Sequence, residues 1–308
     1  MNSITSLFLL VLVTPPVLPA QDTQLRFDAD QIAGPVSPAD RERWLADLRH
    51  WRMEYLIRIG YSNAEYLRPE FRWTQKSFVQ PQMMAEDRYF YDPATRKYTV
   101  DRYLDDLEKR YGGIDSVLVW HTYPNIGIDN RNQFDLLRDM PGGLPGLQQM
   151  IADFHRRGVR VLFPVMVWDQ GTRDEGQPVW EALSGLLAQI RADGVNGDTL
   201  GELPMAFRRA SDSTGYPLVG EPEHMRSDEP LAWNNMNWGS LNSLGAPVVS
   251  RYKWLEPRHM LHISRRWDRA KNDTLQQMLF NGCGYESWER RYAAIVPGYK
   301  SRIAYTRK

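Results

Sequence analysis

The chain has 308 residues, of which 42% are hydrophobic and 12% aromatic, enough for one large domain with a substantial core or for two small ones. Lysine plus arginine and aspartate plus glutamate each number 38, so the formal net charge is zero. This balance argues against a nucleic acid as the partner.

The first twenty residues have the features of a secretory signal peptide. Leu7–Val13 form a compact apolar run that is too short to span a bilayer, and a proline-rich stretch then leads to Ala20, where cleavage is expected. The single cysteine, Cys283, has no intrachain disulfide partner. We therefore expect an exported protein, periplasmic or extracellular, with no membrane span.

Residues 21–76 are interpreted as an N-terminal lead-in that contains one helix. Ser37 is expected to cap this helix and Pro38 to occupy its first position. Apolar side chains then recur at helical spacing over residues 44–55, which indicates that the helix packs against the rest of the chain.

From residue 77 onward, apolar strand-like segments alternate with amphipathic ones. Seven strands are predicted, at 77–83, 114–121, 159–168, 195–198, 216–221, 248–254 and 278–284. Helices are predicted at 101–111, 144–157, 179–192, 203–211 and 265–275, and residues 222–247 are interpreted as an irregular excursion. Near-continuous apolar strands separated by helices predict a parallel sheet, and the regular steps favour a TIM (β/α)8 barrel over 77–289. No phosphate-binding glycine motif follows a strand, which argues against a nucleotide-binding sheet.

The last residues, 290–308, form an atypical basic tail with six basic residues and no acid. No eighth strand–helix unit is apparent there, and a barrel without one has two open strand edges. The sequence leaves two explanations. Either the lead-in helix or a strand near Tyr55–Ile59 closes the barrel, or the barrel is incomplete at its C-terminus because the chain is a shortened form of a longer enzyme.

In a barrel of this kind the active site lies at the C-terminal ends of the strands. Carboxylates and aromatic side chains gather after the predicted strands. The candidate site residues are His121, Tyr123, Trp168, Asp169, Asp198, Glu221, Glu223, Trp254, Glu256, Glu286 and Trp288. Cleavage of a glycosidic bond needs such a set, because one carboxylate attacks or activates water while a second donates a proton to the leaving oxygen. Aromatic side chains can stack on the sugar rings.

Asp198 is distinguished by the glycines around it. Gly194, Gly197 and Gly201 leave the backbone bare on both sides, and we expect them to let a substrate ring approach. The alternative is that Asp198 caps the helix that follows.

Other patterns favour simpler roles. His259 and His262 form an H-x-x-H pair without the glutamate context of a zinc site, and the acids of 129–135 miss the ligand spacing of a calcium loop. No cofactor and no metal are expected. Trp233 and Trp238 lie among asparagines, where they suit either a sugar-binding lid or a place inside the barrel rim.

Four segments resemble a known class of enzymes. GIDSVLVWHTYPNIGIDNRNQFD (113–135) and LPGLQQMIADFHRRGVRVLFPVMVWDQGT (144–172) resemble the second and third units of the α-amylase-like and α-galactosidase-like glycoside hydrolase barrels. GVNGDTL (194–200) resembles their fourth strand, and LVGEPE (218–223) resembles the amylase-type fifth strand.

The resemblance, which covers residues 77–289, implies that Asp198 is the nucleophile of a retaining enzyme and Glu221 its acid/base. The galactosidase-like pattern points instead towards Glu256, and Glu286 is a third candidate. Asn196 stands where α-amylases have an arginine, which argues against a plain α-amylase. We therefore predict an exported glycoside hydrolase that acts on an oligo- or polysaccharide. The alternative is a non-catalytic carbohydrate-binding protein derived from a shortened barrel.

Overall fold

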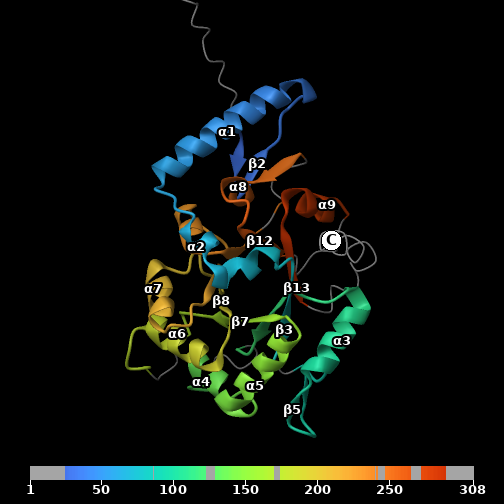
Figure 1. The fold of residues 1–308 in the computed structure, drawn as a ribbon, viewed down its shortest axis with the longest axis vertical. Helices are drawn as coiled ribbons and strands as arrows, with labels where there is room; N and C mark the ends of the chain where they lie inside the picture. Colours follow the sequence, from blue (N-terminus) through green and yellow to red (C-terminus); the bar gives the residue numbers. More distant parts are fainter. Residues whose placement is uncertain are drawn as a thin grey trace, which may run out of the picture.

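The computed structural model describes residues 25–85, 87–122, 129–169, 174–239, 241, 247–264 and 272–288. Its centre is a sheet of eight parallel strands, hydrogen-bonded in the order β10-β12-β13-β3-β6-β7-β8-β9. Strands β9 and β10, at the two ends of this order, lie next to each other, so the sheet curves into a barrel (Figure 1). The predicted TIM (β/α)8 fold is therefore confirmed. In chain order the strands are β3 (Val79–Met84), β6 (Ser116–Trp120), β7 (Arg160–Val165), β8 (Gly194–Gly197), β9 (Val219–Pro222), β10 (Met236–Gly239), β12 (Met260–Ser264) and β13 (Gly284–Trp288).

Side chains alternate between the two faces of each barrel strand. One set points outward into the main apolar core, where Val117, Val161 and Val195 are fully buried. This core lies under the helices that surround the barrel (Figure 1). The α-helices between the barrel strands are α3 (Val100–Tyr111), α4 (Gln133–Arg138), α5 (Gly143–Arg156), α6 (Val179–Ile190), α7 (Met205–Ser213), α8 (Arg251–Leu255) and α9 (Asn272–Asn281).

The lead-in begins as predicted and then closes the bottom of the barrel. The Ser37 hydroxyl accepts a hydrogen bond from the Ala39 amide at 3.2 Å and caps η1 (Pro38–Asp40), which continues into α1 (Arg41–Arg58). After α2 (Ala64–Leu67), η2 (Pro69–Lys76) brings Phe71 against residues at the N-terminal ends of β9, β10 and β12. The lead-in thus seals the end of the barrel opposite the expected active site.

The strand predictions for the second half of the chain were partly wrong. Residues 248–254 do not form a barrel strand. Instead β11 (Val248–Ser250) pairs antiparallel with β2 (Gln31–Ala33) in a small separate sheet, and α8 (Arg251–Leu255) follows. The sixth barrel strand, β10, lies within the stretch interpreted as irregular, and residues 278–281 belong to α9. The small sheet also contains β1 (Phe27–Asp28).

These corrections raise the number of barrel strands from seven to eight. The last strand, β13, pairs in parallel with β3, so the expected open edge between the last and first strands is absent from the described part of the chain. The lead-in does not supply a barrel strand.

The two ends of the chain are not tested. The predicted signal peptide at 1–20 and the basic tail at 290–308 both lie outside the described residues, as would a helix after β13. Within the described ranges, no helix combines the length and apolar character needed to cross a membrane. The remaining elements are the hairpin of β4 (Tyr91–Asp92) and β5 (Lys97–Tyr98) and the short helix η3 (Glu229–Ala232).

Candidate active site

The middle of the barrel holds a closed polar network around Glu221. Its carboxylate accepts hydrogen bonds from Gln80 Nε2 on β3 at 2.6 Å and from Asn196 Nδ2 on β8 at 3.3 Å, and it contacts His262 Nδ1 on β12 at 2.6 Å. Because these partners come from three different strands, Glu221 points into the barrel interior. It is fully buried. The sequence placed it at the mouth, but the structure encloses it one layer below.

His262 provides the charge opposite Glu221. Its Nε2 lies 2.6 Å from the Ser77 carbonyl oxygen, which can only accept, so Nε2 carries a proton. Burial lowers the pKa of His262, but the attraction and hydrogen bond of Glu221 and the bond to Ser77 outweigh it and raise the pKa above its ordinary value. The raised pKa favours the imidazolium form of His262 beside Glu221, and both side chains are inaccessible to solvent.

Glu286, the third catalytic candidate, lies in the same interior. It is fully buried and accepts a hydrogen bond from Ser264 Oγ at 2.9 Å. Its backbone is in register with Gln80 on β3, and its charge contributes to the raised pKa of His262.

Asp198 and Glu223 form the carboxylate pair at the mouth. Asn196 and Glu221 are paired across β8 and β9, so the residues two positions further on lie opposite each other where these strands end. The backbone confirms this continuation, because the Glu223 amide donates to the Gly197 carbonyl at 3.0 Å. Asp198 is 6% exposed, and Glu223 is half-buried.

Thr199 links the two acids. Its backbone N–H donates to Glu223 Oε2 at 2.7 Å, although it directly follows Asp198. This geometry needs a left-handed backbone, with φ of +61° at Thr199. Such a conformation costs a non-glycine residue about 1–3 kcal/mol and is unusual for a β-branched one. Strained backbone of this kind concentrates at functional sites, which favours this turn as the site.

The glycines around Asp198 have a different role from the one expected. A Cβ at Gly194 would lie 2.9 Å from the Val219 carbonyl oxygen, and one at Gly201 would lie 2.6 Å from Arg226 Cγ. Protein atoms, rather than an open approach for a sugar, occupy these spaces. The helix-cap alternative for Asp198 was also wrong, because α7 begins after Pro204.

Three further candidates follow the neighbouring strands β6 and β7. His121 is buried and its Nε2 lies 3.2 Å from the Gln133 carbonyl oxygen; burial lowers the pKa of this histidine to about 4, so the imidazole is neutral at pH 7. Trp168 is 50% exposed, and burial raises the pKa of its neighbour Asp169. Tyr123 and the side chain of Trp288 lie outside the described residues.

Trp254 and Glu256 are on the wrong side of the barrel for a role at the mouth. They precede β12 rather than ending a strand, because residues 248–250 belong to the small sheet. Trp254 Nε1 donates to the Leu48 carbonyl of α1 at 3.3 Å. Burial raises the pKa of Glu256, but hydrogen bonds from Arg258 and Tyr61 outweigh it and hold the pKa below its usual value. Glu256 is thus a structural anion.

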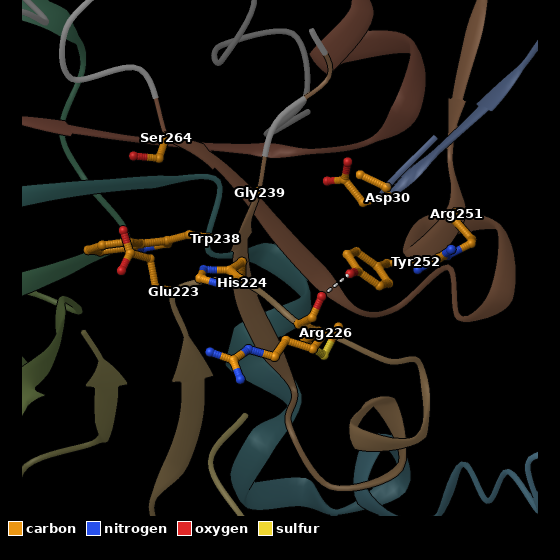
Figure 2. A pocket seen from close by; sticks show the side chains of 11 residues that line it. Asp30, Glu223, His224, Arg226, Trp238, Gly239, Arg251, Tyr252 and Ser264 are labelled. Carbon is orange, nitrogen blue, oxygen red and sulfur yellow. Dashed lines mark hydrogen bonds between the residues drawn. The ribbon is translucent and has the colours of Figure 1, made fainter. Parts of the chain in front are cut away.

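A cavity of about 580 Å³ opens beside Glu223 (Figure 2). Trp238 and Gly239 of β10 and Ser264 of β12 line one side of it. Its far wall includes Asp30 from the turn between β1 and β2, a residue that the sequence did not indicate. Nothing local marks Asp30, since the β2–β11 pairing that brings it there joins segments more than 200 positions apart.

The two tryptophans of residues 233–238 are built into the barrel. Trp238 is 1% exposed and packs in an interior apolar cluster with Trp120, while Trp233 Nε1 donates to the Leu203 carbonyl at 2.8 Å. Both tryptophans therefore lie inside the barrel rim and do not form a sugar-binding lid. Among the described residues no group of three or more His, Cys, Asp or Glu side chains could hold a metal ion.

No protein-family model and no curated protein matches this sequence. Solved structures do. An α-N-acetylgalactosaminidase from Bifidobacterium bifidum, in complex with Gal-NHAc-DNJ, aligns over 84% of this chain and 57% of its own at 14% identity, with a TM-score of 0.50. A noncanonic maltogenic α-amylase from Thermotoga neapolitana aligns over 71% and 69% at 13% identity and TM-score 0.43. An α-amylase from Lactobacillus plantarum aligns over 54% and 53% at 12% identity and TM-score 0.38.

The chain thus spans between about half and two thirds of the length of these structures. At these identities the likeness concerns the fold. The eight parallel strands and the likeness to the α-N-acetylgalactosaminidase show that the chain has a (β/α)8 barrel fold.

Proposed function

We propose that the chain is a retaining glycoside hydrolase whose catalytic carboxylates are Asp198 and Glu223. The observation that carries the proposal is the placement of these two acids, opposite each other at the C-terminal ends of adjacent strands, joined through the Thr199 amide. Neighbouring strands lie roughly 4.8 Å apart. Side chains carried at that backbone spacing can bring two carboxyl groups to the separation of about 5–5.5 Å that retaining enzymes use.

Each acid then has one role. Asp198 attacks the anomeric carbon and forms a glycosyl ester, while the bond from that carbon to the leaving oxygen breaks. Glu223 gives its proton to the leaving oxygen. Because Oε2 accepts the Thr199 N–H, that proton is carried on Oε1. In the second step Glu223 takes a proton from water, whose oxygen attacks the anomeric carbon and releases Asp198.

The substrate is an oligo- or polysaccharide outside the cytoplasm. The aromatic residues at the mouth, with Trp168 half exposed, support carbohydrate as the ligand. Export rests on the apolar run and proline-rich stretch within residues 1–20. Detection of the mature N-terminus after secretion, by mass spectrometry, tests this part independently of activity.

A panel of aryl α- and β-glycosides tests the reaction. We expect the purified chain to hydrolyse at least one, and Asp198→Asn and Glu223→Gln each to lose about 10²–10⁴-fold or more in kcat. A 2,4-dinitrophenyl leaving group needs no protonation, so it should restore the first step in Glu223→Gln and not in Asp198→Asn.

Two results would count against the proposal. A folded wild-type chain that binds sugars but hydrolyses no glycoside would favour the carbohydrate-binding alternative. Hydrolysis that survives both substitutions would exclude this carboxylate pair.

A further inference from the structure

Among the described residues, Arg226 is a cation without a side-chain partner at the edge of the cavity beside Glu223. It lines that cavity together with Arg251. Arg251 is paired with Asp228 at 3.1 Å. By contrast, no hydrogen bond or ion pair is made by the exposed guanidinium of Arg226 within the described part of the chain. Of the two arginines in the cavity, Arg226 is the one left to bind a ligand.

The backbone holds the Arg226 side chain in a defined place. A Cβ at position 201 would lie 2.6 Å from Arg226 Cγ, 2.8 Å from Cδ and 3.0 Å from Nε, so the side chain lies across the bare backbone of Gly201. The Arg226 amide also donates to the Gly201 carbonyl at 3.3 Å. Gly201 belongs to the turn that follows Asp198, and Arg226 lines the same cavity as Glu223, so the backbone anchors this cation at the cavity beside Glu223.

The acids of the cavity do not neutralise this cation. Asp30 lies at the other end, where its Oδ2 is 2.7 Å from the position of a Cβ on Gly239 (Figure 2). Glu223 Oε2 accepts the Thr199 amide at 2.7 Å, and within the described residues no ion pair joins Glu223 or Asp30 to Arg226.

We propose that Arg226 binds a carboxylate on the sugar, so that the site takes acidic glycosides of the uronic acid class. This inference rests on the proposed function, because it assumes that a sugar occupies the cavity beside Glu223. The planar guanidinium matches a carboxylate through two parallel hydrogen bonds, which are stronger than bonds between neutral groups. The neutral hydroxyl groups of the ring have Asp30 and Ser264 as further partners in the same cavity.

Equilibrium binding of monosaccharides tests the inference without requiring turnover. D-glucuronate and D-galacturonate are compared with D-glucose and D-galactose by calorimetry or ligand-observed NMR, and galactose 6-sulfate tests a different anion. We expect the uronates to bind the wild type at least about tenfold more tightly than the neutral sugars, which corresponds to about 1.4 kcal/mol. Arg226→Gln should remove that preference, and Arg226→Lys should keep part of it.

Arg209→Gln is the matched control, because Arg209 is an exposed arginine on α7 outside the cavity. Equal binding of uronates and neutral sugars, an absence of uronate binding, or an unchanged preference in Arg226→Gln would each overturn the inference. A preference for galactose 6-sulfate over the uronates would overturn the carboxylate assignment.

The two proposals fail separately. If uronates bind through Arg226 and no glycoside is hydrolysed, the binding site stands and the catalytic proposal falls. If neutral glycosides are hydrolysed and Arg226→Gln has no effect, the catalytic proposal stands and the uronate-binding proposal falls.

Discussion

The substitution Glu221→Gln separates a structural acid from a catalytic one. Glu221 lies on β9 and Glu223 directly follows the end of that strand, two residues further along the same face, so the same change at each position makes a matched pair. Glu221 is fully buried and contacts the His262 imidazolium at 2.6 Å. Glu223 is half-buried and accepts one backbone hydrogen bond, from Thr199. We expect Glu221→Gln to reduce stability and Glu223→Gln to reduce activity.

The magnitude follows from the burial of the pair. Removing one partner of a buried ion pair costs about 3–5 kcal/mol, because the other charge is left without compensation. For a domain of this size that loss lowers the thermal midpoint by roughly 10 °C. Glutamine also cannot replace every contact of Glu221, since its amide nitrogen meets either the donors of Gln80 and Asn196 at the Oε2 position or His262 Nδ1 at the Oε1 position. Glu223→Gln should cost about 1 kcal/mol or less.

The effect of Glu221→Gln depends on pH. In the wild type the pKa of His262 is raised, so its contribution to stability is fully present below the unfolded pKa of about 6.5. That contribution is lost as the pH rises through the higher folded value. Without the Glu221 charge, burial lowers the pKa of His262, and the variant loses stability as the pH falls below about 6.5. The stability difference between wild type and variant should therefore be largest in mild acid and shrink at alkaline pH.

The assay is denaturant unfolding of both variants and the wild type at several pH values, with glycoside hydrolysis measured on the same samples. A double variant that also replaces His262 completes the cycle and isolates the coupling of the pair. The reasoning is refuted if Glu221→Gln leaves the unfolding free energy unchanged across pH and abolishes hydrolysis, while Glu223→Gln stays active. Glu221 would then be the catalytic acid.

Two further predictions concern the turn after Asp198. Thr199→Gly relieves a strained φ of +61°, so it should leave stability unchanged or raise it by up to about 1 kcal/mol, and it should lower kcat because the Glu223 carboxylate is held less firmly. The control is Arg191→Gly, with φ of +65° at the end of α6, which should leave kcat unchanged; loss of activity in both variants would contradict the prediction. Gly201→Ala should displace the Arg226 side chain and abolish any preference for uronates. Gly185→Ala in α6, where the glycine has open space around it, should keep that preference. Calorimetry measures both variants, and a preserved preference in Gly201→Ala would show that Arg226 can bind uronates without its contact with Gly201.

The first half of the barrel was predictable because its strands are apolar on their outer face and are bounded by helices with clear signals. Strands β6 and β7 lie inside the predicted segments 114–121 and 159–168. Strands β10 and β12 were missed because their polar residues are satisfied only in three dimensions. Asn237 accepts a hydrogen bond from His259 at 2.6 Å, and His262 is compensated by Glu221 from another strand.

The sequence predicted that the candidate site lies at the ends of the strands, but it did not predict which glutamate lies at the mouth. Asp198 follows its strand as the sequence indicated. The alternation of side chains puts Glu221 and Glu223 on the same face, and the local sequence does not distinguish them. The choice is made by Gln80 and His262, which enclose the first acid and come from strands distant in the sequence. Contacts between residues so far apart in the chain leave no pattern in the local sequence.

The contacts of Glu221 with residues from distant strands also explain the role of the asparagine at position 196. The sequence resemblance to α-amylases implies an arginine at this place, two residues before the nucleophile. Here Asn196 Nδ2 donates to the Glu221 carbonyl and carboxylate, but it brings no charge. The positive charge opposite Glu221 comes from His262 on β12 instead. The interior of the barrel therefore holds a carboxylate below the mouth whose partner, His262, lies on a different strand from Asn196. Because an imidazolium can lose its proton as the pH rises and a guanidinium does not, we expect the network beneath Asp198 and Glu223 to depend on pH.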